Sequence, residues 1–147
     1  MDDNVISFTE RRRIRDEDAR MRVMKWIDRG EVYQYYVDII EVSIRHFTRL
    51  QRYVAEEYLS EVISESFFRG VHASRQYEAG WTTEDIVNRY NQDHAALLYS
   101  LASEYRLSRH LGEWDLYSVS IIAEDVTGKW FQKGLAYGRK QRKLKLF

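Results

Sequence analysis

Apolar side chains recur at spacings of three and four residues along most of the chain, and strict alternation of apolar and polar residues is nowhere sustained. A period of this kind places apolar side chains on one face of an α-helix. The clearest series is Leu116, Val119, Ala123, Val126, Trp130, Gly134 and Tyr137. The pattern therefore predicts an all-α fold whose last helix turns one apolar face to the core, with Gly134 and Gly138 letting another helix approach closely.

The stretch from Glu31 to Arg69 contains neither glycine nor proline, yet its apolar positions form two stripes. The first stripe ends at Phe47 and the second begins at Ala55. Helices of globular domains usually run about 8–20 residues, which is shorter than this whole stretch. We therefore predict two helices with a break at Thr48–Arg52, and one continuous helix is the alternative.

The N-terminal part begins with a short extension, residues 1–7, and then shows a helix-start signal. Ser7 and Glu10 have the spacing of a capping box, in which each side chain binds an otherwise unpaired backbone N–H. This spacing predicts a helix over residues 8–29, and Gly30 suits the position just after its end. The first half of this helix is highly charged, so we expect only its second half to pack on the core.

Two further boundaries are marked by glycine. Gly80, followed by Thr82 and Thr83, predicts the end of one helix and the capped start of the next. Gly112 predicts a second break. Short connections of this kind join antiparallel neighbours. We therefore expect residues 1–147 to form a single-domain bundle of about five helices, mainly antiparallel.

Composition narrows the class of protein. The chain has 147 residues, 44% of them hydrophobic, and no cysteine, which excludes disulfides and thiolate metal sites. The opening "MDDNVISFTERRR" carries acids where a secretory signal carries bases. No apolar run approaches the roughly 20 residues of a spanning helix. We therefore expect a soluble cytoplasmic protein with no membrane partner.

No recognisable catalytic or cofactor motif is present. Neither phosphate-binding loop, G-x-x-x-x-G-K nor G-x-G-x-x-G, occurs in the chain. The Glu-x-x-His pairs of di-metal bundles are also missing, because no acidic residue lies three positions before any histidine. We therefore predict no catalytic set, cofactor or metal. A metal-binding bundle enzyme is kept as a third hypothesis, with a looser site drawn from His46, His72, His94, His110, Glu61 and Glu65.

His94 lies on an apolar stripe, directly after Asp93. A general base would need a partner and a pocket, which spacing alone does not locate. We therefore interpret His94 as a buried, neutral histidine that is hydrogen-bonded to a hydroxyl or to the backbone.

Tyrosine and arginine are abundant, and both are enriched at protein interfaces. Several aromatic and aliphatic residues also lie away from the predicted core stripes. Our leading hypothesis is a non-enzymatic protein that acts through protein–protein contact, with a regulatory role and a homodimer both open. The residues that we predict to make this contact are Tyr33, Tyr35, Tyr117, Ile121 and Leu135.

The C-terminus is strongly basic. After Gly138 the cationic residues no longer keep to the polar side of the helix, which predicts that the helix ends there and is followed by a separate basic tail, 139–147. The second hypothesis is a nucleic-acid-associated regulator that uses this tail together with Arg11–Arg15. Its predicted contacts are Arg139, Lys140, Arg142, Lys143 and Lys145.

Three stretches carry a resemblance to known proteins: "VISF" before a charged helix, the region around Gly70, and "KWFQKG" with "RKQRKLK" near the end. With these stretches the chain resembles a small family of cytosolic proteins of endospore-forming Gram-positive bacteria, a domain of unknown function. The resemblance implies a small helical cytosolic protein. It implies no activity and no functional residues.

Overall fold

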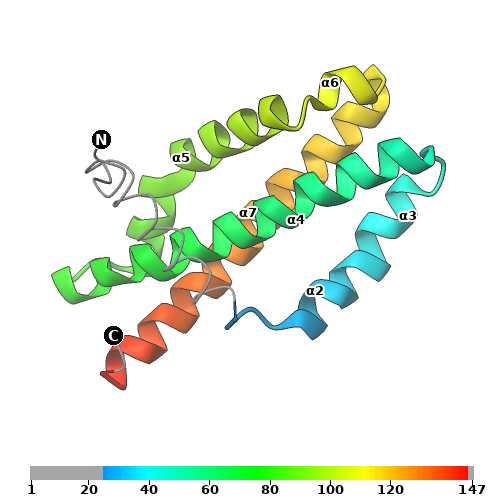
Figure 1. The fold of residues 1–147 in the computed structure, drawn as a ribbon. Coiled ribbons are helices and arrows are strands. Elements are labelled where there is room, and N and C mark those ends of the chain that lie inside the picture. Colours follow the sequence, from blue (N-terminus) through cyan, green and yellow to red (C-terminus); the bar gives the residue numbers. More distant parts are fainter. Residues whose placement is uncertain (1–24, 146–147) are drawn as a thin grey trace, which may run out of the picture.

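The computed structural model describes residues 25–145, which form five helical segments (Figure 1). The first is continuous and comprises α2 (Arg29–Tyr35), a π-helical turn (Tyr36–Ile40) and α3 (Glu41–Ile44). The others are α4 (Arg49–Ala73) with a 3₁₀ turn (Ser74–Ala79), α5 (Thr83–Glu104), α6 (Leu107–His110) and α7 (Glu113–Lys143). The predicted all-α bundle is confirmed. The first part of the helix predicted over residues 8–29, and the 1–7 extension, lie outside the described residues.

The break predicted at Thr48–Arg52 is confirmed. Thr48 is the N-cap of α4. Its hydroxyl accepts a hydrogen bond from the Gln51 N–H at 3.2 Å, and the Gln51 side chain accepts one from the Thr48 N–H at 3.0 Å. This capping box pairs two N–H groups that would otherwise be unpaired, so the chain starts a new helix here.

The glycine boundaries are confirmed as well. Gly80 ends the 3₁₀ turn with φ of +88°, a left-handed conformation that favours glycine. Thr82 then caps α5 in a second capping box, with Asp85 as its partner. Gly112 is the N-cap of α7, although it offers no side chain for capping.

Thr82→Ala is expected to lower the free energy of unfolding by about 1 kcal/mol, because it removes the hydroxyl that accepts from the Asp85 N–H at 3.1 Å. Urea unfolding followed by circular dichroism measures the change. Thr82→Ser keeps the hydroxyl and serves as the control. Equal stability of the two variants would show that the cap contributes nothing.

The prediction that Gly30 follows the end of a helix is wrong. Asp28 caps the start of α2, where its carboxylate accepts from the Gly30 N–H at 2.9 Å and the Glu31 N–H at 3.3 Å. Gly30 therefore lies in the first turn of α2. An aspartate at an N-cap is a strong start signal, and it overrides the stop signal of the glycine that follows.

The prediction that the last helix ends at Gly138 is also wrong, because α7 continues to Lys143. Its basic end packs on the 3₁₀ turn that follows α4. The Arg142 guanidinium donates to the Ser74 hydroxyl at 2.8 Å, and that of Arg139 lies 4.3 Å from the ring centroid of Tyr77. After the apolar stripe ends, polar and cation–π contacts therefore hold the last part of α7 against the 3₁₀ turn.

Helices α4 and α7 run in the same direction and cross with their backbones in contact. This confirms the prediction that Gly134 and Gly138 let another helix approach closely. A Cβ atom on Gly70 would lie 3.0 Å from the Cα of Gly134, and one on Gly138 would collide with Ser74. Nearer the start of each helix, the buried Ser66 and Thr127 hydroxyls are hydrogen-bonded at 2.7 Å. The absence of side chains on the glycines lets the two backbones touch.

The remaining helices run antiparallel to this pair, α2–α3 on one side and α5–α6 on the other (Figure 1). Tyr35 donates to Asp125 and His46 is hydrogen-bonded to Asp115, each at 2.7 Å, which fixes α2–α3 against α7 in the opposite direction. The predicted antiparallel arrangement therefore holds for α2–α3 and for α5–α6, each against the pair of α4 and α7. The closest pair, α4 and α7, is parallel.

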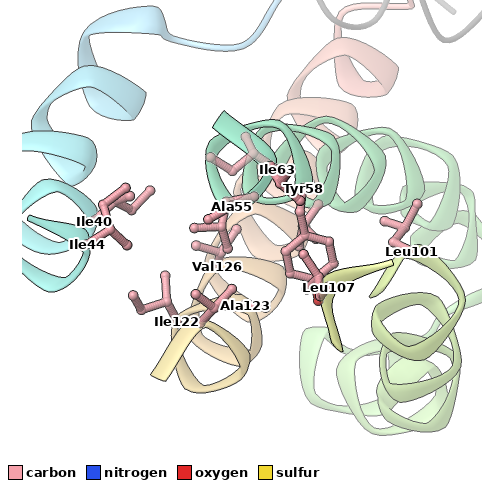
Figure 2. Packing of buried hydrophobic residues seen from close by; sticks show 14 of the residues in the cluster. Ile40, Ile44, Ala55, Tyr58, Ile63, Leu101, Leu107, Ile122, Ala123 and Val126 are labelled. Atoms are coloured by element: carbon pink, nitrogen blue, oxygen red, sulfur yellow. The ribbon is translucent and has the colours of Figure 1, made fainter. Parts of the chain in front are cut away.

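The main core lies on both sides of the crossed pair. Figure 2 shows Ile40 and Ile44 reaching toward Ile122 of α7, while Tyr58 of α4 lies beside Leu107 of α6. A second cluster contains Ala73, Ile86, Phe131 and Leu135, where the start of α5 meets α7. One side of α7 is thus enclosed by three other helices.

Candidate functional site

The opposite side of α7 is exposed, and three large apolar residues lie on it among polar ones. Trp114, Tyr117 and Ile121, spaced by three and four residues, lie on one side of the helix, and their exposed fractions are 80%, 61% and 49%. We name these three residues the outer stripe. Such a stripe is the pattern by which one helix face packs on another. Neither α2–α3 nor α5 covers it.

A groove of about 730 Å³ runs beside the outer stripe, between α5 and α7, and we name it the α5–α7 groove. Leu98 and Tyr99 of α5 and Leu116 of α7 contribute apolar surface to it. Glu124 and Gly128 also line it, and they continue the spacing of the outer stripe along α7. The groove and the stripe therefore form one continuous face.

His94 lies on the groove and is 7% exposed. Its ring contacts Phe131 edge-on, with centroids 4.6 Å apart. Its Nδ1 atom has no hydrogen-bond partner among the described residues. The predicted burial of His94 is confirmed, and within residues 25–145 Nδ1 is not the atom that makes the predicted hydrogen bond to a hydroxyl or to the backbone.

The surroundings of His94 keep the imidazole neutral. Burial lowers its pKa below the ordinary 6.5, the charge of Arg69 lowers it further, and Asp93 opposes both effects. The predicted neutral state is therefore supported by the local chemistry.

This shift predicts that the protein becomes less stable as the pH is lowered in the acid range. The unfolded chain binds a proton at this histidine near pH 6.5, whereas the folded protein resists it, so the free energy of unfolding decreases as pH falls below about 6.5. The slope contributed by one such group is at most about 1.4 kcal/mol per pH unit. Urea unfolding between pH 5 and 8 measures it. His94→Phe should flatten the profile, and an unchanged profile would contradict the assignment.

Two other polar groups define the charge of the groove. Burial, with the charge of Glu124, raises the pKa of Tyr58 to about 12, so its phenol stays protonated. With His94 and Tyr58 uncharged, Glu124 is the one charged side chain among the described residues that line the groove. The groove therefore combines apolar surface with uncharged polar groups and a single negative charge.

The predicted contact residues do not form a single surface. Tyr117 and Ile121 lie together in the outer stripe, and Tyr33 is exposed beside a different hollow, of about 680 Å³, between α2 and α4. Tyr35 is half-buried and binds Asp125. Leu135 is 1% exposed because the first turns of α5 cover that side of α7, so in this fold it does not lie on the surface.

Trp114 is the residue of the outer stripe that the sequence analysis did not name. It follows Gly112 so closely that it reads as part of a loop. Its spacing of three and seven residues from Tyr117 and Ile121 was the available signal.

The basic residues at the end of α7 have mixed surroundings. Arg139 and Arg142 contact the 3₁₀ turn, whereas Lys140 and Lys143 line a hollow of about 550 Å³ beside Tyr77. Lys145 follows the helix with a positive φ of 57°. The nucleic-acid hypothesis stays a prediction. Two of its predicted contact residues, Arg139 and Arg142, make contacts within the fold.

The looser metal site is not formed in the described part of the chain. Within residues 25–145 no three histidine or acidic side chains gather as metal ligands. His46 is instead paired with Asp115, and His72 stacks beside Phe68 with centroids 6.4 Å apart.

No known family model, curated protein or solved structure matches this chain. The resemblance to a family of endospore-forming bacteria therefore stays a prediction. In residues 25–145, no helix has the length and apolar character needed to cross a membrane.

Proposed function

We propose that this is a non-enzymatic helical protein that acts through protein–protein contact and that the outer stripe of α7 is its contact surface. A single observation carries the proposal: Trp114, Tyr117 and Ile121 are large, exposed and on one side of one helix. Tryptophan and tyrosine dominate the binding energy of protein interfaces. A contiguous apolar patch of this kind marks an interaction site on a soluble protein.

The form of the stripe favours a helical partner. Spacings of three and four residues over two turns match the anchors by which one helix docks on another. The partner that we favour is a second copy of the chain, because the identical stripes of two copies can bury each other around a two-fold axis.

Ile121→Arg is expected to abolish this association, because it places a charge at one end of the stripe, beside Tyr117. Leu50→Arg is the matched control, because Leu50 is an exposed aliphatic residue like Ile121 but lies on α4. Sedimentation velocity over a concentration series measures self-association, and affinity purification from the source cell measures other partners. A strict monomer that recovers no partner would end the proposal.

A further inference from the structure

We propose that the hollow beside Tyr77, at the end of α7, binds a small molecule that carries a phosphate group. We name it the basic hollow, because Arg139, Lys140 and Lys143 line it from α7; Tyr77 and Thr83 line it from the 3₁₀ turn and the start of α5. It lies toward the other end of α7 from the outer stripe, so the proposal does not rest on any protein partner.

The basic hollow has the size of a small-molecule site and one basic end. Its volume of about 550 Å³ lies within the range of roughly 300–1,000 Å³ that is typical of ligand sites. The residues that line it from the last three turns of α7 are Gln132, Leu135, Ala136, Arg139, Lys140 and Lys143. They follow one another at spacings of three and four residues from turn to turn, so they share one helix face. Along this face the lining changes from uncharged to basic.

The charge of the basic hollow is positive throughout. Among the described residues, three cations line it and no acidic side chain does. Within residues 25–145, none of Arg139, Lys140 and Lys143 forms an ion pair. Arg142 differs from them, because its guanidinium lies 3.9 Å from the Glu78 carboxylate. Like charges on neighbouring turns of a helix repel each other, so a bound anion would relieve this repulsion.

The hydrogen-bond donors of the basic hollow suit a phosphate group. The guanidinium of Arg139 lies 4.3 Å from the ring centroid of Tyr77, a cation–π contact that holds it in place. The exposed hydroxyls of Tyr77 and Thr83 are hydrogen-bonded at 2.6 Å, which uses one of their two protons and leaves the other to donate. A phosphate group has three acceptor oxygens and up to two negative charges. It therefore matches several converging cations better than a singly charged carboxylate does.

The spread of the cations favours a small ligand over a nucleic acid. Arg139 and Lys143 are four residues apart, which is a rise of about 6 Å along the helix. Successive phosphates of one DNA strand are about 3.4 Å apart along the duplex axis. The basic hollow thus offers a strand only about two phosphate contacts. A single diphosphate is compact enough to meet all three cations at once.

Isothermal titration calorimetry of the full chain with inorganic pyrophosphate tests the ligand class. We expect saturable binding at one site per chain at an ionic strength of about 0.15 M. Acetate at the same ionic strength should show no saturable binding, because its single charge balances only one of the cations. A single-stranded DNA of about 20 nucleotides without terminal phosphates, measured by fluorescence anisotropy, should bind at least about tenfold more weakly than pyrophosphate.

Three variants locate the site. Lys143→Gln should lower the affinity for pyrophosphate about tenfold, because it removes a charged donor from an exposed position. Arg139→Gln should lower it by a similar factor, and thermal unfolding checks that this variant stays folded without its contact to Tyr77. Lys129→Gln is the matched control, since it removes the same charge from an exposed position of α7 outside the basic hollow. It should leave the affinity unchanged.

Nuclear magnetic resonance gives a readout at the site itself. Titration with pyrophosphate should shift the ring C–H signals of Tyr77, and Lys143→Gln should move this shift to higher pyrophosphate concentrations. The proposal is overturned if pyrophosphate gives no saturable binding, if acetate binds as well as pyrophosphate, or if Lys129→Gln and Lys143→Gln weaken binding equally. It is also overturned if the DNA binds as tightly as pyrophosphate or more tightly, since the basic end of α7 would then be a nucleic-acid interface.

Discussion

Gly134→Ala is expected to lower the free energy of unfolding by about 3 kcal/mol or more, because the new methyl group has no space. It would lie against the Phe67 carbonyl oxygen and 3.0 Å from the Cα atom of Gly70. Both obstacles are backbone atoms of α4, so no side chain can rotate away. The two helices would have to separate, and the contacts along their whole crossing would loosen.

Gly128→Ala is the matched control, since it makes the same change in the same helix. A Cβ atom at Gly128 would meet nothing within 4 Å. Alanine is the better helix former, so this variant should be unchanged or more stable by up to about 1 kcal/mol. Urea unfolding compares the two variants. Identical midpoints would show that the close crossing of α4 and α7 does not hold the fold together.

Phe131→Ala is expected to cost about 3–5 kcal/mol, which is the usual loss for truncating a fully buried phenylalanine. The ring is completely buried in the cluster that joins α5 to α7. Its centroid lies 4.6 Å from that of His94 and 5.4 Å from that of Tyr90. Removing it would leave a cavity between the two helices and free the ring of His94.

Tyr99→Ala is the control for aromatic truncation, because Tyr99 lies on the same helix pair but is exposed. Its effect on the free energy of unfolding should remain within about 0.5 kcal/mol. Urea unfolding measures both variants. A loss below about 1 kcal/mol for Phe131→Ala would contradict the packing of α5 on α7 described above.

The helix boundaries could be predicted from the sequence where a short-range rule decides them. Thr48 and Thr82 each cap a helix with a partner three residues later, so the local sequence contains the whole signal. The spacing of Gly134 and Gly138 likewise predicted a close helix approach. These features need no knowledge of the rest of the fold.

Other features depend on contacts between distant segments. The parallel crossing places Gly70 against Gly134, and nothing in either local sequence names the other as its partner. Past Gly138, Arg142 of α7 donates a hydrogen bond to Ser74, which lies far away in the sequence. The amphipathic pattern reflects only apolar contacts, so the helix end that it predicted lies about one turn before the observed end.

The candidate site was predictable only in part for the same reason. Tyr117 and Ile121 lie off the core stripe, and both are exposed. Leu135 has the same pattern in sequence but is buried, because Ile86 at the start of α5 packs beside it. Only the position of α5 separates an outer residue of α7 from a buried one.

Site-specific photo-cross-linking in living cells tests most directly whether the outer stripe is a protein contact surface. A benzophenone amino acid would replace Tyr117 in one variant and Tyr53 in the other; Tyr53 is an equally exposed tyrosine, at 62%, on α4. We expect a discrete protein adduct at Tyr117 that is absent at Tyr53, and this adduct has twice the mass of the chain if the partner is a second copy. No adduct at Tyr117 above the level at Tyr53 would contradict it.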